Sequence, residues 1–293
     1  MKGDFIMHRL LGVLSALTMG ILTVFYPVKG AQLTASDWEE YYLQDTETAG
    51  LVTFDSEKAV WQDGYGIDMS NAKHGIVTVS CTSEDKLHLW VRHEMYDTDY
   101  AIPNDGTPFT IPLSCGDGEY KISVMECVRD TKYKYGYTVS LNAHILDSKL
   151  PYLYTNGYVS YNSDSICVKK AEEIAKQSKT REEFIENVKT YIESNITYDK
   201  SYVPTKLSAH NINPDSTIRD RSGICFDFAS LMTAMLRSQG IPARLVFGYL
   251  SSDSDAYYHA WTDVYIDGEW VTVDACLSEE EAALAAYRPT QYF

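Results

Sequence analysis

Two hydrophobic periodicities divide this chain, and that division limits its fold more than any single motif does. From about residue 50 to 150, apolar and polar residues alternate in short runs, which is the pattern of half-buried strands. Turn-rich breaks at 104–106 and 115–118 separate some of these runs, which cover 75–81, 87–91, 109–113, 120–124 and 135–145. Short strands with close turns predict a small antiparallel β-sandwich in this region.

From about residue 160 the spacing of apolar residues becomes helical. The sequence predicts one helix over 165–176 and a second that begins at the capping box of Thr180 and Glu183. A third helix is predicted over 225–239, and Gly240 and Pro242 end it. The polar stretch around Asn213 is predicted to be a loop, and strands are predicted at 244–250, 261–266 and 269–273. Helices followed by strands indicate an α+β fold. We therefore predict a β-sandwich-like accessory domain at 31–155 and an α+β domain at 156–293.

The first thirty residues have the composition of an export signal. Lys2 and Arg9 precede an uncharged apolar run over 10–26, and Pro27 interrupts the run shortly before Gly30. This order is typical of a secretory signal peptide, which is removed from the mature protein. An uncleaved anchor is the alternative, although the run falls short of the roughly 20 residues that span a bilayer. The predicted location is secreted or on the extracellular face of the membrane.

The net charge excludes one class of partner. The chain has 25 Lys and Arg residues against 41 Asp and Glu residues, so its formal net charge is −16. No basic stripe offsets this excess, and we expect no binding to the phosphate backbone of nucleic acids. The acidity is better explained as solubility outside the cell than as substrate selection.

Cys225 lies where a predicted helix begins, shortly after Gly223. The unpaired N–H groups and partial positive charge of a helix N-terminus favour a thiolate, and the same N–H groups can donate to the oxyanion of an attacked acyl group. Gly223 would let a substrate backbone approach closely. The alternative is an ordinary buried thiol, since free cysteine is among the most buried residue types.

The predicted hairpin brings together groups that can serve such a thiol. A tight Asp267-Gly268 turn sets a register in which Asp274 faces Trp261 and lies diagonal to His259. A carboxylate at that position can orient the imidazole, which can take the thiol proton and later give it to a leaving amine. Because a nucleophile, a base and an orienting group are predicted together, a shared catalytic role is favoured over a separate structural role for each residue.

Two other residues compete for these roles. Cys276 faces His259 in the same register and is a rival nucleophile, but it lacks the helix N-terminus and the preceding glycine. His210 is a rival base, but it lies in a polar stretch and is expected to be exposed. We therefore favour Cys225 and His259.

Five segments occur in order in the C-terminal half: Gly223-Ile224-Cys225-Phe226-Asp227-Phe228-Ala229, Gly240-Ile241-Pro242-Ala243-Arg244, Gly248-Tyr249, His259-Ala260-Trp261 and Val273-Asp274. A further segment, 196–199, lies upstream of these five. With these segments the chain resembles the transglutaminase-like superfamily of papain-type cysteine enzymes. The resemblance implies a papain-like core, with Cys225 as nucleophile, His259 as base and Asp274 as orienting group. It also implies acyl transfer through a thioester. We expect Gly223 and Trp261 to take part in substrate binding. The Ala275-Cys276-Leu277 sequence departs from the proline that often follows the aspartate in this family.

The other five cysteines have no predicted catalytic role. Cys81 and Cys127 both follow strand-like runs and are candidates for a disulfide across the sandwich, which export would permit. Cys115, Cys167 and Cys276 are left without a predicted pairing. No Cys/His group has zinc-ligand spacing, and neither a phosphate loop nor a dinucleotide fingerprint is present. We therefore predict no metal and no cofactor.

These observations favour a secreted or cell-surface cysteine enzyme that hydrolyses peptide or amide bonds. The expected substrate is an extracellular protein or peptide, or cell-wall material. A cross-linking transglutaminase, which passes the acyl group to an amine, is one alternative. A catalytically idle surface protein with a binding or structural role is another. The sequence does not distinguish transfer to water from transfer to an amine.

Overall fold

Two four-stranded antiparallel sheets make up the N-terminal part of the computed structural model, which describes residues 52–94, 96–129, 132–201, 212–252 and 255–293. One sheet has the order β1-β2-β3-β6 and the other the order β5-β4-β7-β8. The strands of the first are Val60–Gln62, Tyr65–Asp68, Ile76–Cys81 and Phe109–Pro112 in chain order. Those of the second are β4 Leu87–Arg92, β5 Asp97–Ile102, β7 Gly118–Arg129 and β8 Lys132–Ala143.

Burial alternates most clearly in β4 among the five predicted strands, whereas β3 and β6 are buried at almost every position. In β4 every second residue is buried, so one face of the strand contributes Leu87, Leu89 and Val91 to the core. Three further strands were not predicted. β2 is buried at all four positions and β1 is exposed at all three, so neither has an alternating pattern, and β5 contains Asp97 and Asp99.

The candidate disulfide between Cys81 and Cys127 is not formed, and that prediction is wrong for this structure. All six cysteines lie in described parts of the chain, and none is in a disulfide. Cys81 is buried at the end of β3 in the first sheet, whereas Cys127 lies on β7 in the second sheet. Burial raises the pKa of the Cys81 thiol to about 11, so this thiol stays protonated in the core.

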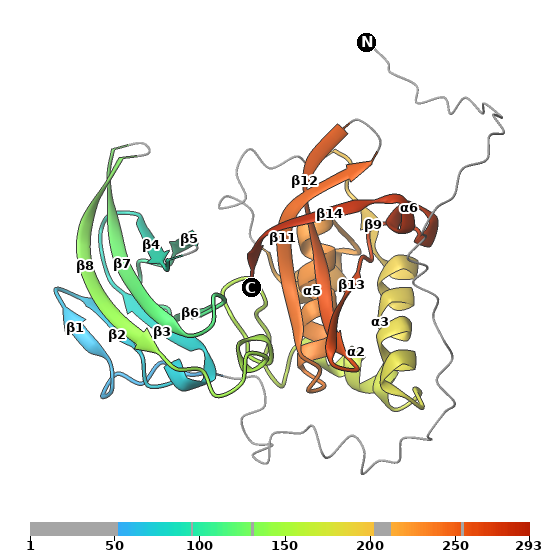
Figure 1. Ribbon diagram of the computed structural model, residues 1–293, viewed down its shortest axis with the longest axis horizontal. Coiled ribbons are helices and arrows are strands. Elements are labelled where there is room, and N and C mark those ends of the chain that lie inside the picture. The colour runs from blue at the N-terminus through green and yellow to red at the C-terminus, as the bar shows by residue number, and fades with distance from the viewer. Residues whose placement is uncertain (1–51, 95, 130–131, 202–211, 253–254) are drawn as a thin grey trace, which may run out of the picture. The chain divides into compact units, whose positions relative to one another are not determined.

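A helical layer and a third antiparallel sheet make up the C-terminal part (Figure 1). The helices are α2 Ile166–Ala175, α3 Arg181–Asn195, α4 Pro214–Asp220, α5 Cys225–Arg237 and α6 Glu279–Leu284. The sheet has the order β13-β12-β11-β14, with β11 Ala243–Ser252, β12 Asp255–Ile266, β13 Glu269–Val273 and β14 Ala286–Tyr292. A short parallel pair, β9 Thr197–Tyr198 and β10 Ser222–Gly223, precedes α5. The α+β prediction is confirmed.

Helix α5 is the buried centre of this part. All 13 of its residues are buried, and it packs against β11 and β12 on one side and against α2, α3 and α4 on the other (Figure 1). Its hydroxyl groups have partners, since Thr233 and Thr262 hydrogen-bond each other across the helix–sheet contact at 3.2 Å. A helix that is enclosed in this way holds its first residue in a fixed position.

Arg237, the last residue of α5, is 1% exposed and lies close to three separate segments. Its guanidinium donates hydrogen bonds to the backbone carbonyls of Ala243 at 2.7 Å, Tyr154 at 2.6 Å and Phe293 at 2.6 Å. The rigid fork of guanidinium donors matches these three backbone oxygens, and the Phe293 oxygen also accepts the N–H of Leu245 at 3.0 Å. Arg237 therefore joins the end of α5 to the start of β11 and to the segment that follows β14.

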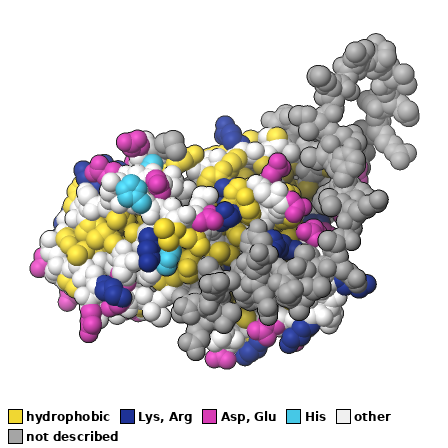
Figure 2. Space-filling view, turned by 60° about the horizontal axis from the view of Figure 1, so that its bottom comes forward, with side chains coloured by type: hydrophobic (Ala, Val, Ile, Leu, Met, Phe, Trp, Pro, Cys, Tyr) yellow, Lys and Arg dark blue, Asp and Glu magenta, His cyan; other side chains and the backbone are white. Residues whose placement is uncertain are grey.

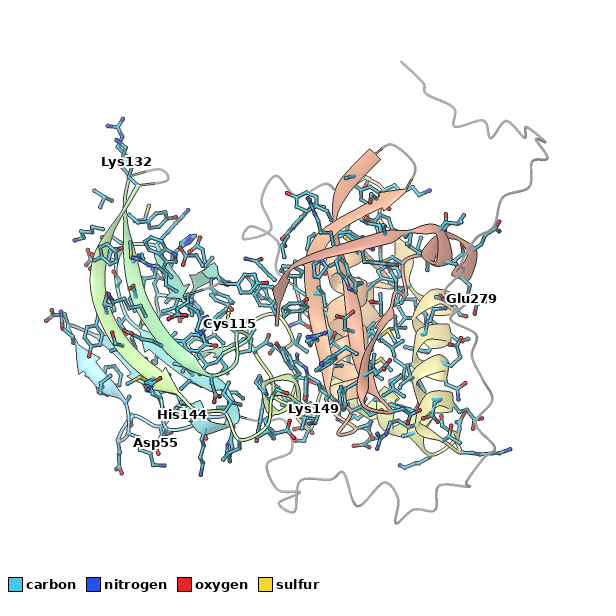
Figure 3. All side chains as sticks on the ribbon, in the orientation of Figure 1. Asp55, Cys115, Lys132, His144, Lys149 and Glu279 are labelled. Carbon is cyan, nitrogen blue, oxygen red and sulfur yellow. The ribbon has the colours of Figure 1, made fainter. Side chains whose placement is uncertain are left out.

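The structure corrects the prediction at three longer elements, besides the short β9–β10 pair, which was not predicted. The stretch predicted as a loop contains α4, which begins at Pro214 because the Asn213 side chain accepts the N–H of Ser216 at 3.0 Å. Helix α6 and strand β14 were not predicted, and Glu279, at the start of α6, is labelled in Figure 3. The boundary predicted near residue 155 stays a prediction. The signal predicted at 1–30 lies outside the described residues, and so does His210.

The surface is mixed in charge. On the face in Figure 2, Lys and Arg side chains are scattered among Asp and Glu side chains and form no continuous basic stripe. Within the described ranges, no helix has the length and apolar character needed to cross a membrane.

Candidate active site

The Cys225 thiol is placed by the N-terminus of α5. The Asp227 carboxylate, which is 7% exposed, accepts the backbone N–H of Ile224 at 2.8 Å and so fixes the first turn of the helix. Cys225 is 5% exposed and begins the helix directly after this cap. The helix therefore directs its positive end toward the sulfur, as the sequence predicted.

The hairpin that carries His259 has the predicted register. Asp267 and Gly268 both have positive φ angles, 50° and 92°, as a primed two-residue turn requires, and Ile266 pairs with Glu269. His259 Nε2 donates to Asp274 Oδ2 at 2.7 Å, and both side chains are almost fully buried. The diagonal contact predicted from the turn is therefore formed.

The charge state of His259 follows from its two partners. Burial lowers the pKa of this imidazole, but hydrogen bonds to Asp274 and to the Cys225 thiol outweigh burial and raise it to about 9. Since Nε2 is occupied by Asp274, Nδ1 is the ring nitrogen left for the sulfur. The structure thus brings together all three residues predicted to be catalytic.

Tyr198, from β9, lies at the same helix end. Its hydroxyl accepts the backbone N–H of Cys225 and hydrogen-bonds the Cys225 thiol, and burial together with these groups raises the pKa of the phenol well above its ordinary value. Its ring is 40% exposed and contacts Phe228 at a centroid distance of 6.0 Å. A neutral phenol beside the sulfur is a side-chain donor that the sequence did not reveal.

The two predicted substrate-binding residues have packing contacts in the structure. A Cβ atom on Gly223 would lie 2.6 Å from Asp227 Cβ, so glycine is needed beside the helix cap. The Trp261 ring is 2% exposed, stacks on the His259 ring at a centroid distance of 6.3 Å and donates through Nε1 to Asp263 at 3.1 Å. Both residues therefore support the site from within, and their role in substrate binding stays a prediction.

Cys276 lies near the site but differs from Cys225 in its surroundings. Its backbone N–H donates to Asp274 Oδ1 at 2.9 Å. Burial, followed by the charges of Asp274 and Cys225, raises the pKa of the Cys276 thiol well above its ordinary value. Because a thiol held neutral is a poor nucleophile, Cys276 serves the site through its backbone.

A pH dependence of stability follows from the raised pKa of His259. A group whose pKa is higher in the folded state stabilises the fold fully below its unfolded value of 6.5, and this contribution is lost as the pH rises through about 9. The loss between pH 6 and pH 10 is expected to be roughly 3 kcal/mol. Urea denaturation of the protein and of its Asp274→Asn variant at both pH values measures it. The variant should lack most of this loss, and equal losses in the two proteins would contradict the assignment.

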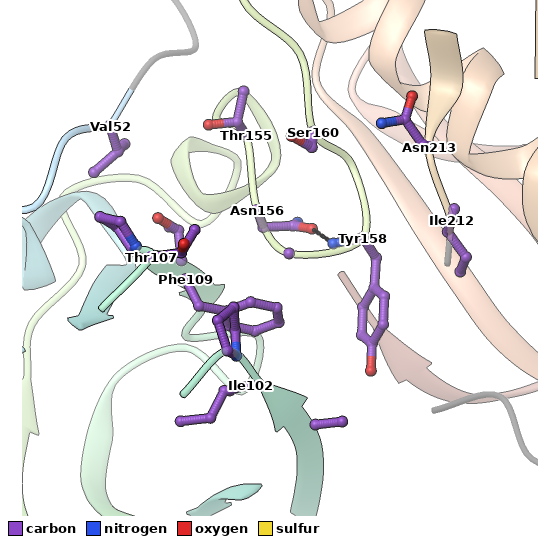
Figure 4. Close-up of a pocket in the computed structure, with 15 residues that line it drawn as sticks. Val52, Ile102, Thr107, Phe109, Thr155, Asn156, Tyr158, Ser160, Ile212 and Asn213 are labelled. Atoms are coloured by element: carbon purple, nitrogen blue, oxygen red, sulfur yellow. Dashed lines mark hydrogen bonds between the residues drawn. The ribbon is translucent and has the colours of Figure 1, made fainter. Parts of the chain in front are cut away.

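A separate pocket of about 590 Å³ lies beside β5 and β6 and contains none of these residues (Figure 4). It has an uncharged lining that includes Phe109, Asn156 and Tyr158, and Asn156 Oδ1 accepts the Tyr158 N–H at 2.9 Å. Among the described residues, no group of three or more His, Cys, Asp and Glu side chains is arranged to hold a metal ion.

Comparison with known proteins assigns the C-terminal segment to a class. Residues 168–275 match the model of the transglutaminase-like superfamily, whose members are generally cysteine-dependent enzymes. The match contains Cys225, His259 and Asp274, and it confirms the resemblance found in the sequence.

Individual similar proteins cover less of the chain. A protein of Mycobacterium leprae is 38% identical over 77 residues, which are 24% of this chain and 27% of that protein. YebA of Bacillus subtilis is 30% identical over 106 residues, 31% of this chain and 14% of that protein. A protein of Methanocaldococcus jannaschii is 29% identical over 106 residues, 33% of this chain and 30% of that protein. The matched part thus spans less than a third of each of these relatives.

Two solved structures are similar to this chain at a lower sequence identity than these relatives. The periplasmic domain of TgpA from Pseudomonas aeruginosa matches with a TM-score of 0.37 and 14% identity, over 78% of this chain and 74% of that chain. LapG of Legionella pneumophila matches with a TM-score of 0.33 and 20% identity, over 46% of this chain and 79% of that chain.

Proposed function

We propose that this protein is a secreted or cell-surface cysteine enzyme that hydrolyses peptide or amide bonds through a thioester. The observation that carries the proposal is the continuous chain of contacts from the Cys225 thiol to His259 and from His259 Nε2 to Asp274 Oδ2. Nucleophile, base and orienting carboxylate in one buried chain are what acyl transfer requires. The superfamily match over 168–275 supports the same reaction class.

In the first half of the reaction, His259 takes the proton of the Cys225 thiol, and the sulfur attacks the substrate carbonyl carbon. The backbone N–H of Cys225 and the hydroxyl of Tyr198 lie beside the sulfur and are the candidate donors to the oxyanion. Collapse of the tetrahedral intermediate breaks the C–N bond. The proton then passes from His259 to the leaving amine, and a thioester on Cys225 remains.

In the second half, His259 takes a proton from water, and the resulting hydroxyl attacks the thioester carbonyl. The C–S bond breaks, the acid is released and the proton returns to the sulfur. An amine in place of water would instead give an isopeptide bond, which is the reaction of a cross-linking transglutaminase. Throughout, Asp274 keeps Nε2 occupied, so that Nδ1 is the nitrogen that exchanges protons.

The proposed substrate is an extracellular protein or peptide, or cell-wall material. The export pattern at 1–30 supports this location. Exposed tyrosine rings lie around the buried site, at Tyr198 and at Tyr257, whose ring centroid is 5.9 Å from that of His259. Such rings offer apolar and hydrogen-bonding contacts to a neutral peptide segment.

A peptide-library digest by the full chain, with and without a primary amine, tests this function. Cleaved peptides whose formation requires Cys225 would support hydrolysis, whereas amine-linked products would identify a transglutaminase. No reaction with any peptide would favour an idle binding protein and would contradict the proposal.

A further inference from the structure

The Asp274 carboxylate has a partner that lies outside the superfamily match. The Tyr287 hydroxyl donates to Asp274 Oδ2 at 3.1 Å, to the same oxygen that accepts His259 Nε2 at 2.7 Å. The other oxygen, Oδ1, accepts the backbone N–H of Cys276. Tyr287 belongs to β14, which begins after residue 275, where the match ends.

Strand β14 holds Tyr287 in this position. Tyr287 pairs with Leu250 of β11, and the register shifts between Phe247 and Gly248 just beyond this pair. The edge of the Tyr287 ring meets the Trp261 ring at a centroid distance of 5.0 Å and an angle of 62°. The Trp261 ring thus contacts both the His259 ring and the Tyr287 ring.

The phenol at this position is a donor and not a competing acid. Burial, together with the neighbouring Asp274 carboxylate, raises the pKa of Tyr287 well above its ordinary value. A hydrogen bond to an ionised carboxylate is among the stronger hydrogen bonds in proteins. It fixes the direction of Oδ2 and withdraws negative charge from it.

We propose that Tyr287 is a positioning residue of the active site, which orients Asp274 toward His259 and shares the charge of its carboxylate. This inference rests on the proposed function, because it assigns Tyr287 to the same proton transfer. Tyr287 acts through Asp274 and His259 and needs no contact with the substrate. Strand β14 therefore completes a site whose nucleophile, base and orienting carboxylate lie within the superfamily match.

The Tyr287→Phe variant tests the proposal, because it keeps the ring against Trp261 and removes only the hydroxyl. Without this donor the Asp274 charge acts undiminished on the imidazolium, so the NMR titration midpoint of His259 in the full-length protein should rise by about half a pH unit. On a peptide found in the library digest, kcat should fall by about three- to tenfold with KM unchanged. Tyr249→Phe, at an exposed tyrosine of β11, is the matched control and should change neither quantity.

A double-mutant cycle separates positioning from packing. In an Asp274→Asn background, Tyr287→Phe should leave the titration midpoint of His259 unchanged, because the charge that it acts on is gone. An unchanged or lower midpoint in the single variant would overturn the proposal, and so would an equal rise in both backgrounds. The titration needs no substrate. If no peptide is cleaved but the midpoint rises as described, only the proposed reaction fails.

Discussion

Replacement of Cys225 by alanine is expected to reduce turnover of any library peptide by roughly a thousandfold or more. The substitution removes the thiol that lies both at the N-terminus of α5 and beside the His259 ring. No thioester can then form. Since Cys225 is small and buried, the variant should retain the fold, which circular dichroism and thermal unfolding would verify.

The control for this prediction is Cys276→Ser. This cysteine serves Asp274 through its backbone N–H, which serine keeps, so turnover should stay within about threefold of the parent protein. If Cys276→Ser abolished turnover and Cys225→Ala did not, the assignment of the nucleophile would be wrong.

Replacement of Arg237 by methionine is expected to have the largest effect on stability. It leaves the carbonyls of Ala243 and Tyr154 without their guanidinium donor, whereas the Phe293 oxygen keeps the N–H of Leu245. An unsatisfied buried polar group costs about 1–3 kcal/mol, so the free energy of unfolding should fall by about 3 kcal/mol or more. Urea denaturation at pH 7 measures the difference.

Two variants show whether the loss comes from these bonds. Arg219→Met, at an exposed arginine of α4, should change the free energy of unfolding by no more than about 0.5 kcal/mol. Arg237→Lys keeps the charge but cannot present the planar fork, so it should recover only part of the loss. Full stability in Arg237→Met would contradict the structural role given to these hydrogen bonds.

The features of the site that could be predicted from the sequence are those that depend on residues close to one another along the chain. The Asp267-Gly268 turn fixes the register of its hairpin, and a fixed register brings His259 close to Asp274. The helix that begins at Cys225 follows from its apolar periodicity and from the stop signal at Gly240. These features need only neighbours along the chain, which is why they could be predicted.

The rest depends on contacts between distant segments. Tyr198 and Tyr287 come from short strands on either side of the catalytic segments, and only pairing with β10 and β11 brings them to the site. Tyr198 lies in the segment 196–199, which resembles the family, so the sequence pointed to this segment. Nothing in the sequence indicated that Tyr198 contacts Cys225. Helix α4 was missed because its Asn213 cap and Pro214 were interpreted as loop residues.

The most direct test of the central claim is to observe the acyl group on the enzyme. The full-length protein is mixed with a library peptide that it turns over, quenched in acid and digested with trypsin. Cleavage after Arg221 and Arg237 places Cys225 in the peptide 222–237, whereas Cys276 falls in 245–293, because trypsin does not cleave between Arg288 and Pro289. The account predicts an acyl adduct on 222–237 that hydroxylamine removes and that Cys225→Ala lacks. An adduct confined to 245–293, or turnover with no adduct on either peptide in a rapid quench, would contradict it.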